Sequence, residues 1–112
     1  MKTMRRVFQL EMFDVSIGVV VTRDIPAAYK REFGIEIDHT MMACLGYHGR
    51  RFVLFLEPAA VSRREIIAHE IFHLTHRILE KCSMNFDSGH HEVGAYLCEH
   101  LTKKVFAILK GK

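Results

Sequence analysis

The chain has 112 residues, a length that suits one domain with a modest core and leaves no room for a second. Hydrophobic residues make up 49% of it and charged residues 26%, which are the proportions of an ordinary globular protein rather than of a disordered segment. The formal net charge of +3 is mild and its basic doublets are dispersed, which argues against a nucleic-acid interface.

Nothing in the sequence indicates secretion or membrane insertion. The start of the chain is basic, but Gln9 and Glu11 interrupt the segment after it, and no apolar stretch is long enough to span a bilayer. The three cysteines, Cys44, Cys82 and Cys98, are odd in number and lack C-x-x-C spacing, as expected of reduced thiols. We therefore expect a cytoplasmic protein without a membrane partner.

The first elements expected are strands. Residues 5–13 alternate in polarity, with Leu10 and Met12 on one face, which predicts a half-buried strand. Residues 15–22 are β-branched and apolar, and they predict a second strand or a continuation of the first after a bend near Asp14.

A helix is expected over residues 25–33, because a proline falls in its first turn and a glycine follows its end. Residues 41–47 and 51–57 predict two more strands joined by a turn at residues 48–50. With two further helices at the end of the chain, the order ββαββαα predicts an α+β fold.

The first of these helices contains the motif His69-Glu70-Ile71-Phe72-His73, which has the pattern H-E-x-x-H. Ser62 and Glu65 have the spacing of a capping box and predict the start of the helix. His69, His73 and His76 fall on one shared face. A separate, apolar face is expected to pack on the core: Ile66, Ile67, Ile71, Leu74, Ile78 and Leu79.

The spacing of the motif predicts a metal site. Helical residues four apart lie about 40° apart around the axis and about 6 Å apart along it, so His69 and His73 can share one ion. Glu70, on the adjoining flank, would be the general base for a water rather than a ligand. Two imidazoles and a carboxylate suit zinc, although iron, nickel and manganese accept the same ligands.

A catalytic zinc site needs a third protein ligand, and the second helix offers three candidates in its first turn. Glu92 is favoured because it starts an i, i+4 series with Tyr96, while His91 and His90 are the alternatives. An antiparallel return of this helix would bring that turn back toward the motif helix. Its own apolar stripe is expected to be Val93, Leu97, Leu101, Val105 and Ile108.

The motif, followed 19 residues after His73 by Glu92-Val93-Gly94-Ala95-Tyr96, resembles the gluzincin arrangement. It is most similar to small zincin-like metallopeptidases of phage and prophage genomes, and more distantly to ImmA/IrrE-type domains. The resemblance covers the C-terminal half by motif and the N-terminal half by element order only. It implies a small, mainly antiparallel sheet packed on the two helices, zinc held by His69, His73 and Glu92, and Glu70 as the general base.

The expected activity is metal-assisted hydrolysis of a peptide or isopeptide bond in a protein or peptide substrate. Tyr96 is the candidate to stabilise the oxyanion, with His76 and the unused member of the pair His90 and His91 as further candidates. The strand at residues 51–57 is expected to bind an extended substrate by edge pairing.

The alternative is a catalytically inert protein of phage type, stabilised by zinc, that binds a host protein and regulates it. Glu70 separates the two hypotheses, because a purely structural zinc site has no use for a base at that position. The sequence does not indicate the substrate or the oligomeric state.

Overall fold

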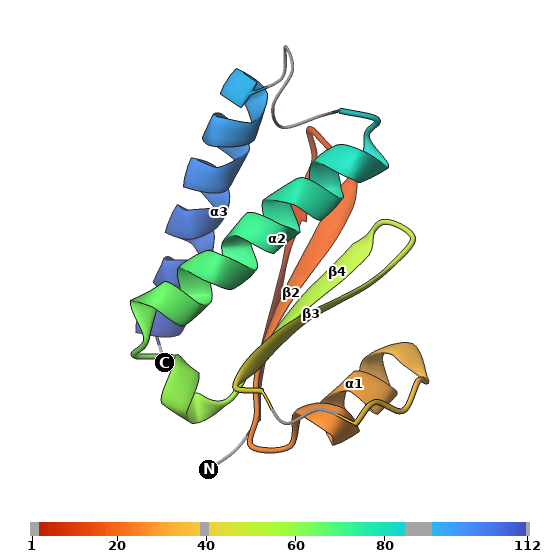
Figure 1. The fold of residues 1–112 in the computed structure, drawn as a ribbon, viewed down its shortest axis with the longest axis vertical. Helices are drawn as coiled ribbons and strands as arrows, with labels where there is room; N and C mark the ends of the chain where they lie inside the picture. The colour runs from red at the N-terminus through yellow and green to blue at the C-terminus, as the bar shows by residue number, and fades with distance from the viewer. Residues whose placement is uncertain (1–2, 39–40, 85–90, 112) are drawn as a thin grey trace.

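The computed structural model describes residues 3–38, 41–84 and 91–111, and these form an α+β fold, as predicted (Figure 1). The strands are β1 (Met4–Leu10), β2 (Val15–Val21), β3 (Ala43–His48) and β4 (Arg51–Leu56). The helices are α1 (Ile25–Phe33), α2 (Arg64–Lys81) and α3 (His91–Lys110), and a short 3-10 helix, η1 (Pro58–Ala60), precedes α2. None of the helices in the described ranges is both long enough and apolar enough to cross a membrane.

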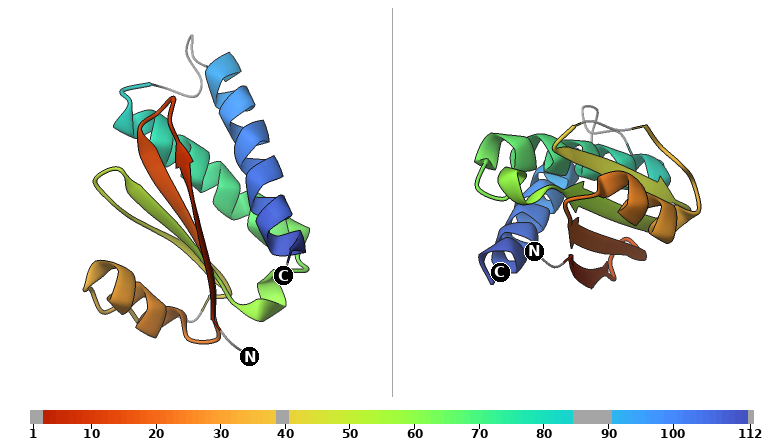
Figure 2. Two further views of the ribbon diagram at one scale, coloured as in Figure 1. Left: turned by 180° about the vertical axis from the view of Figure 1, so that it is seen from behind. Right: turned by 90° about the horizontal axis from the view of Figure 1, so that it is seen from below.

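The four strands form one sheet in the order β1-β2-β4-β3. Two antiparallel hairpins, β1–β2 and β3–β4, are joined by a parallel pairing of β2 with β4. Helix α1 covers one face of the sheet, whereas α2 and α3 cover the other (Figure 2). Both faces of β2 and β4 are therefore buried, which explains why their sequences are almost continuously apolar.

The position of β4 corrects one expectation. Residues 51–57 were expected to bind a substrate by edge pairing, but β4 lies between β2 and β3 and has no open edge. The edges of the sheet are β1 and β3. The uninterrupted apolar run of β4 is the physical reason, because only an interior strand can bury both of its faces.

The first strand is shorter than predicted. It ends at Leu10, which pairs with Val15, and residues 11–14 form the turn of a hairpin, with Asp14 at a φ of 54°. Met12 therefore lies outside the sheet and is 89% exposed instead of sharing the buried face of Leu10. The predicted segment 15–22 forms the separate strand β2, which ends at Val21, rather than a continuation of the first strand.

Helix α2 begins differently from the prediction. Its N-cap is Arg63, and no side chain caps it. The Glu65 carboxylate accepts a hydrogen bond from Arg63 Nε at 2.8 Å instead of completing a capping box with Ser62. A guanidinium two residues away is a stronger partner for a carboxylate than a backbone amide.

The predicted apolar stripes of both helices are confirmed. In α2 the buried members are Ile67, Ile71, Leu74, Ile78 and Leu79, and Ile66 is half-buried. In α3 they are Leu97, Leu101 and Val105, with Val93 and Ile108 half-buried. The two helices run antiparallel (Figure 1), and Arg64 at the start of α2 lies over the Phe106 ring near the end of α3.

Helix α1 is attached to the sheet by packing and by charge. A Cβ atom on Gly46 of β3 would lie 2.7 Å from ring atoms of Tyr29 and Phe33, so only glycine permits this approach. Glu32 accepts a hydrogen bond from Arg5 Nε at 2.7 Å and also pairs with Arg51. These contacts, chiefly the hydrogen bond from Arg5, lower the pKa of Glu32.

Candidate metal centre

The two histidines of the motif converge on one point. The Nε2 atoms of His69 and His73 lie 3.1 Å apart, and their rings are 4.6 Å apart at an interplanar angle of 81°. Both side chains are exposed on the face of α2 that turns away from the core. Two imidazoles on a tetrahedral zinc ion, each at roughly 2.0–2.1 Å, would hold their nitrogen atoms about 3.3 Å apart, so the pair fits this metal.

Glu70, between them in the sequence, lies in a different environment. Only 7% of its surface is exposed, and no hydrogen bond or ion pair to its carboxylate is found among the residues that the structure describes. A buried carboxylate without such a partner is unusual, since the cost of removing the charge from water is left uncompensated. Both oxygen atoms of this carboxylate thus have no hydrogen-bond partner within the described part of the chain.

The surroundings of Glu70 include the edge strand β3. The pKa of the Cys44 thiol on β3 is raised to about 11, mainly by burial and to a smaller extent by the charge of Glu70. Glu70 also precedes Arg77 by two helical turns, and Arg77 contacts Tyr47 of β3, so Glu70 lies on the side of α2 that packs beside β3. Cys44, Cys82 and Cys98 are all free, half-buried thiols.

The contact between α2 and β3 extends toward the end of the helix. The Arg77 guanidinium lies 5.6 Å from the centroid of the Tyr47 ring, and it donates a hydrogen bond to Glu80 at 2.9 Å. A hollow of about 390 Å³ opens here, next to the turn between β3 and β4. It is lined by Tyr47, His48, Gly49, Phe52, Arg77, Glu80 and Lys81.

The described residues do not complete the metal site. Across residues 3–38, 41–84 and 91–111, no group of three histidine, cysteine or acidic side chains is placed to hold an ion. Glu92 and His91 are exposed in the first turn of α3 and do not join the histidine pair in such a group. His90 lies outside the described residues. The choice among these three candidates stays a prediction.

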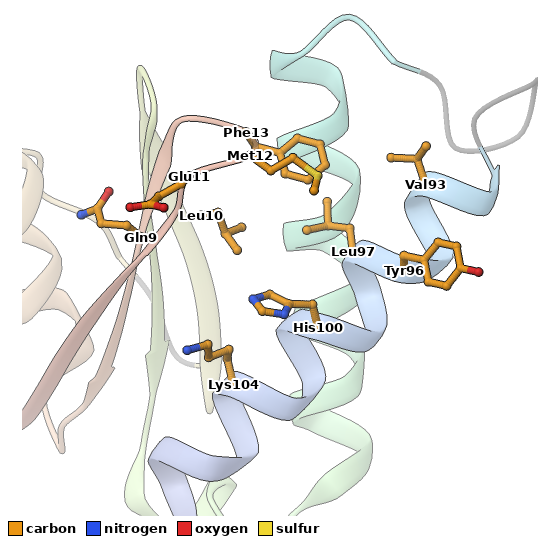
Figure 3. Close-up of a pocket in the computed structure, with 10 residues that line it drawn as sticks. All are labelled: Gln9, Leu10, Glu11, Met12, Phe13, Val93, Tyr96, Leu97, His100 and Lys104. Atoms are coloured by element: carbon orange, nitrogen blue, oxygen red, sulfur yellow. The ribbon is translucent and has the colours of Figure 1, made fainter.

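The candidates for oxyanion stabilisation lie apart from one another. Tyr96 is 67% exposed and lines a cavity between α3 and the turn after β1, to which His69, Glu70 and His73 do not contribute (Figure 3). His76 is exposed beside the ring of Phe72, with ring centroids 5.1 Å apart. The role of each in catalysis stays a prediction.

Strand β3, the edge of the sheet that contacts α2, was not recognised from the sequence as a place for a substrate. Residues 43–47 of β3 carry no charged side chain, whereas the other edge strand, β1, carries Arg5 and Arg6. The continuous apolar run of β4 is typical of an interior strand. This signal could have excluded β4 as an edge strand and indicated β3 as the edge next to the motif helix.

Comparisons with protein-family models, with functionally described proteins and with solved structures gave no significant match to this chain. The resemblance to zincin-like peptidases therefore rests on the sequence, through the H-E-x-x-H motif and the segment that begins at Glu92.

Proposed function

We propose that this chain is a zinc-dependent hydrolase that cleaves a peptide or isopeptide bond in a protein or peptide substrate. The observation that carries the proposal is the 3.1 Å approach of His69 Nε2 to His73 Nε2, with the buried Glu70 next to His69 in the sequence. His69, His73 and one of Glu92, His91 or His90 would hold the ion, with Glu92 preferred. Zinc, when bound, supplies a Lewis acid that polarises a carbonyl and acidifies a water.

Glu70 is the general base in this proposal. Its carboxylate takes a proton from the attacking water and later delivers that proton to the leaving amine. The Glu70 carboxylate accepts no hydrogen bond from the described part of the chain. It can therefore accept the proton without first breaking such a bond. Burial also restricts the side chain, which favours a fixed position for the proton transfer.

The substrate would lie as an extended strand along β3, next to α2. An exposed edge strand presents backbone N–H and C=O groups that pair with a peptide. Charged side chains on an edge discourage such pairing, and β3 lacks them over residues 43–47 whereas β1 has Arg5 and Arg6. The absence of charge on β3 supports the choice of this edge.

The test begins with the metal content of untagged protein, measured by mass spectrometry. We expect one zinc ion per chain, lost in His69→Gln and His73→Gln and retained in His48→Gln, a histidine exposed at the end of β3. Glu92→Ala and His91→Ala then identify the third ligand. Absence of stoichiometric metal in the unmutated protein, even after zinc is supplied, would overturn the proposal.

The second part measures activity on a library of fluorescence-quenched peptides. Glu70→Gln should keep the zinc and reduce turnover at least about 100-fold, because a general base contributes that much. The matched control is Glu99→Gln, which changes an exposed carboxylate on α3 and should retain both the zinc and the turnover. Zinc without any turnover dependent on Glu70 would favour the inert regulatory protein instead.

A further inference from the structure

A separate cavity of about 640 Å³ lies between α3 and the turn that joins β1 to β2 (Figure 3). Its volume falls within the range of small-molecule sites, roughly 300–1,000 Å³. Most of its wall is apolar, and five side chains form that wall: Leu10, Met12, Phe13, Val93 and Leu97. A wall of this kind favours a ligand with a hydrocarbon part.

The polar side of the cavity is formed by His100 and Lys104, one helical turn apart on α3. Both side chains extend from the helix toward β1 (Figure 3). Lys104 forms no ion pair within the described part of the chain, and its Nζ lies 5.9 Å from the centroid of the Phe8 ring. The next lysine, Lys103, differs, because its Nζ lies 3.8 Å from a Glu99 carboxylate oxygen.

Glu11 is the one carboxylate that lines the cavity in the part of the chain that the structure describes. It belongs to the turn after β1, and in Figure 3 it lies beside Gln9, across the cavity from α3. It is not within ion-pair distance of Lys104. The ammonium group of Lys104 can thus pair with a negatively charged ligand. The Glu11 carboxylate would repel the head group of such a ligand and so favour its position near α3.

We propose that this cavity binds an amphipathic monocarboxylate, with its carboxylate at Lys104 and His100 and its acyl chain on the apolar wall. An ammonium and an imidazole supply hydrogen-bond donors for a carboxylate. The apolar wall removes hydrocarbon from water, which is the larger contribution to affinity. The site is separate from the candidate metal ligands, because neither His69 nor His73 nor Glu92 lines this cavity, although Tyr96, a candidate for oxyanion stabilisation, does.

The test compares three probes with the same hydrocarbon chain by isothermal titration calorimetry, each below its micelle concentration. We expect decanoate to bind more tightly than decanol, and decyltrimethylammonium to bind most weakly. Equal affinities for decanoate and decyltrimethylammonium, or no binding of decanoate to folded protein, would overturn the proposal.

Matched variants locate the head group. Lys104→Met should weaken decanoate about fivefold and leave decanol unchanged, as expected for one partly exposed charge pair. Lys103→Met removes the same charge from the neighbouring position and should have no effect. Glu11→Gln should strengthen decanoate binding, because it removes a like charge. Equal weakening by Lys103→Met and Lys104→Met would overturn the assignment.

Two further variants locate the acyl chain. Val93→Trp, at a half-buried position, should fill the cavity and abolish binding of decanoate and decanol alike. Met12→Asp, at a position 89% exposed, tests the same wall without risk to the fold and should weaken both probes. Unchanged binding of both probes to Met12→Asp and to folded Val93→Trp would place them elsewhere and refute the proposal.

Discussion

At the residue scale, Glu70 is a buried acidic side chain on the motif helix. It lies on the inner side of α2 with 7% of its surface exposed and without a hydrogen-bond partner among the described residues. A buried, unpartnered charge lowers the stability of a protein unless a ligand or a reaction uses it. Its cost to the fold can be measured separately from its role in catalysis.

We predict that Glu70→Leu makes the metal-free protein more stable. Removing an uncompensated buried carboxylate in favour of an apolar side chain should raise the free energy of unfolding by about 1–3 kcal/mol. Urea unfolding at pH 7 measures the change, and Glu99→Leu, at an exposed site on α3, should alter it by less than about 0.5 kcal/mol. A less stable Glu70→Leu protein would mean that Glu70 has a structural partner.

At the scale of elements, the attachment of α1 to the sheet depends on charge as well as on packing. Glu32, near the end of α1, contacts Arg5 of β1 and Arg51 of β4, so one carboxylate joins three elements. The pKa of Glu32 is lowered, chiefly by the hydrogen bond from Arg5. The folded state therefore favours the ionised form of Glu32 over the protonated form.

This lowered pKa gives a prediction with a definite sign. Glu32→Gln should reduce the free energy of unfolding by about 1 kcal/mol at pH 7. The stabilisation by Glu32 is present above its unfolded pKa, about 4.3, and is lost as the pH falls through its lower folded pKa. Urea unfolding from pH 7 to pH 3 should show the two proteins converging. Glu36→Gln, whose ion pair with Lys30 is exposed, should show little change at any pH.

The hydrogen bonds of β3 indicate which of its residues face outward. The Glu57 amide donates to the Met42 carbonyl at 2.8 Å, so this pair lies on the side that faces β4. In an edge strand, the backbone N–H and C=O groups of every second residue point away from the neighbouring strand. In β3 these residues are Ala43, Leu45 and Tyr47, whose backbone groups can therefore pair with a substrate.

Leu45→Pro should therefore remove one outward N–H and leave the pairing with β4 intact, as proline is tolerated on edge strands. If a peptide substrate pairs with β3, the kcat/KM of the Leu45→Pro variant for that peptide should fall about tenfold, which corresponds to the loss of one hydrogen bond. Leu45→Ala keeps the N–H and serves as the control for the lost side chain. Equal activity of the proline and alanine variants, with circular dichroism unchanged, would exclude this binding mode.

The elements differ in how far the sequence predicts them. The stripe of α2 and the approach of His69 to His73 follow from the helical repeat, which is a local property. The prediction that the first strand includes Met12 was wrong, because the alternating pattern of polarity continues beyond the end of β1 into the turn. The third ligand and the position of β4 depend on contacts between distant segments, which spacing along the chain does not encode.

At the scale of the whole molecule, zinc would link the motif helix to the last helix if Glu92 is a ligand. An ion that binds only the folded state stabilises it by about 2.7 kcal/mol at one hundred times its Kd. We predict that saturating zinc raises the Tm of the unmutated protein by roughly 10 °C. His73→Gln should remove this increase and His48→Gln should retain it. Differential scanning calorimetry measures both, and a Tm indifferent to zinc would contradict the proposed centre.

The parallel pairing of β2 with β4 has a consequence for the order in which the protein assembles. Each hairpin closes through neighbours in the sequence and can form quickly, but β4 must find β2 across α1 and β3, which is a slow, non-local step. During synthesis the first hairpin leaves the ribosome before any of its partners exist. Its apolar face is covered only when α2 and α3 follow, so the nascent chain exposes an uncovered sheet until its last helix is made.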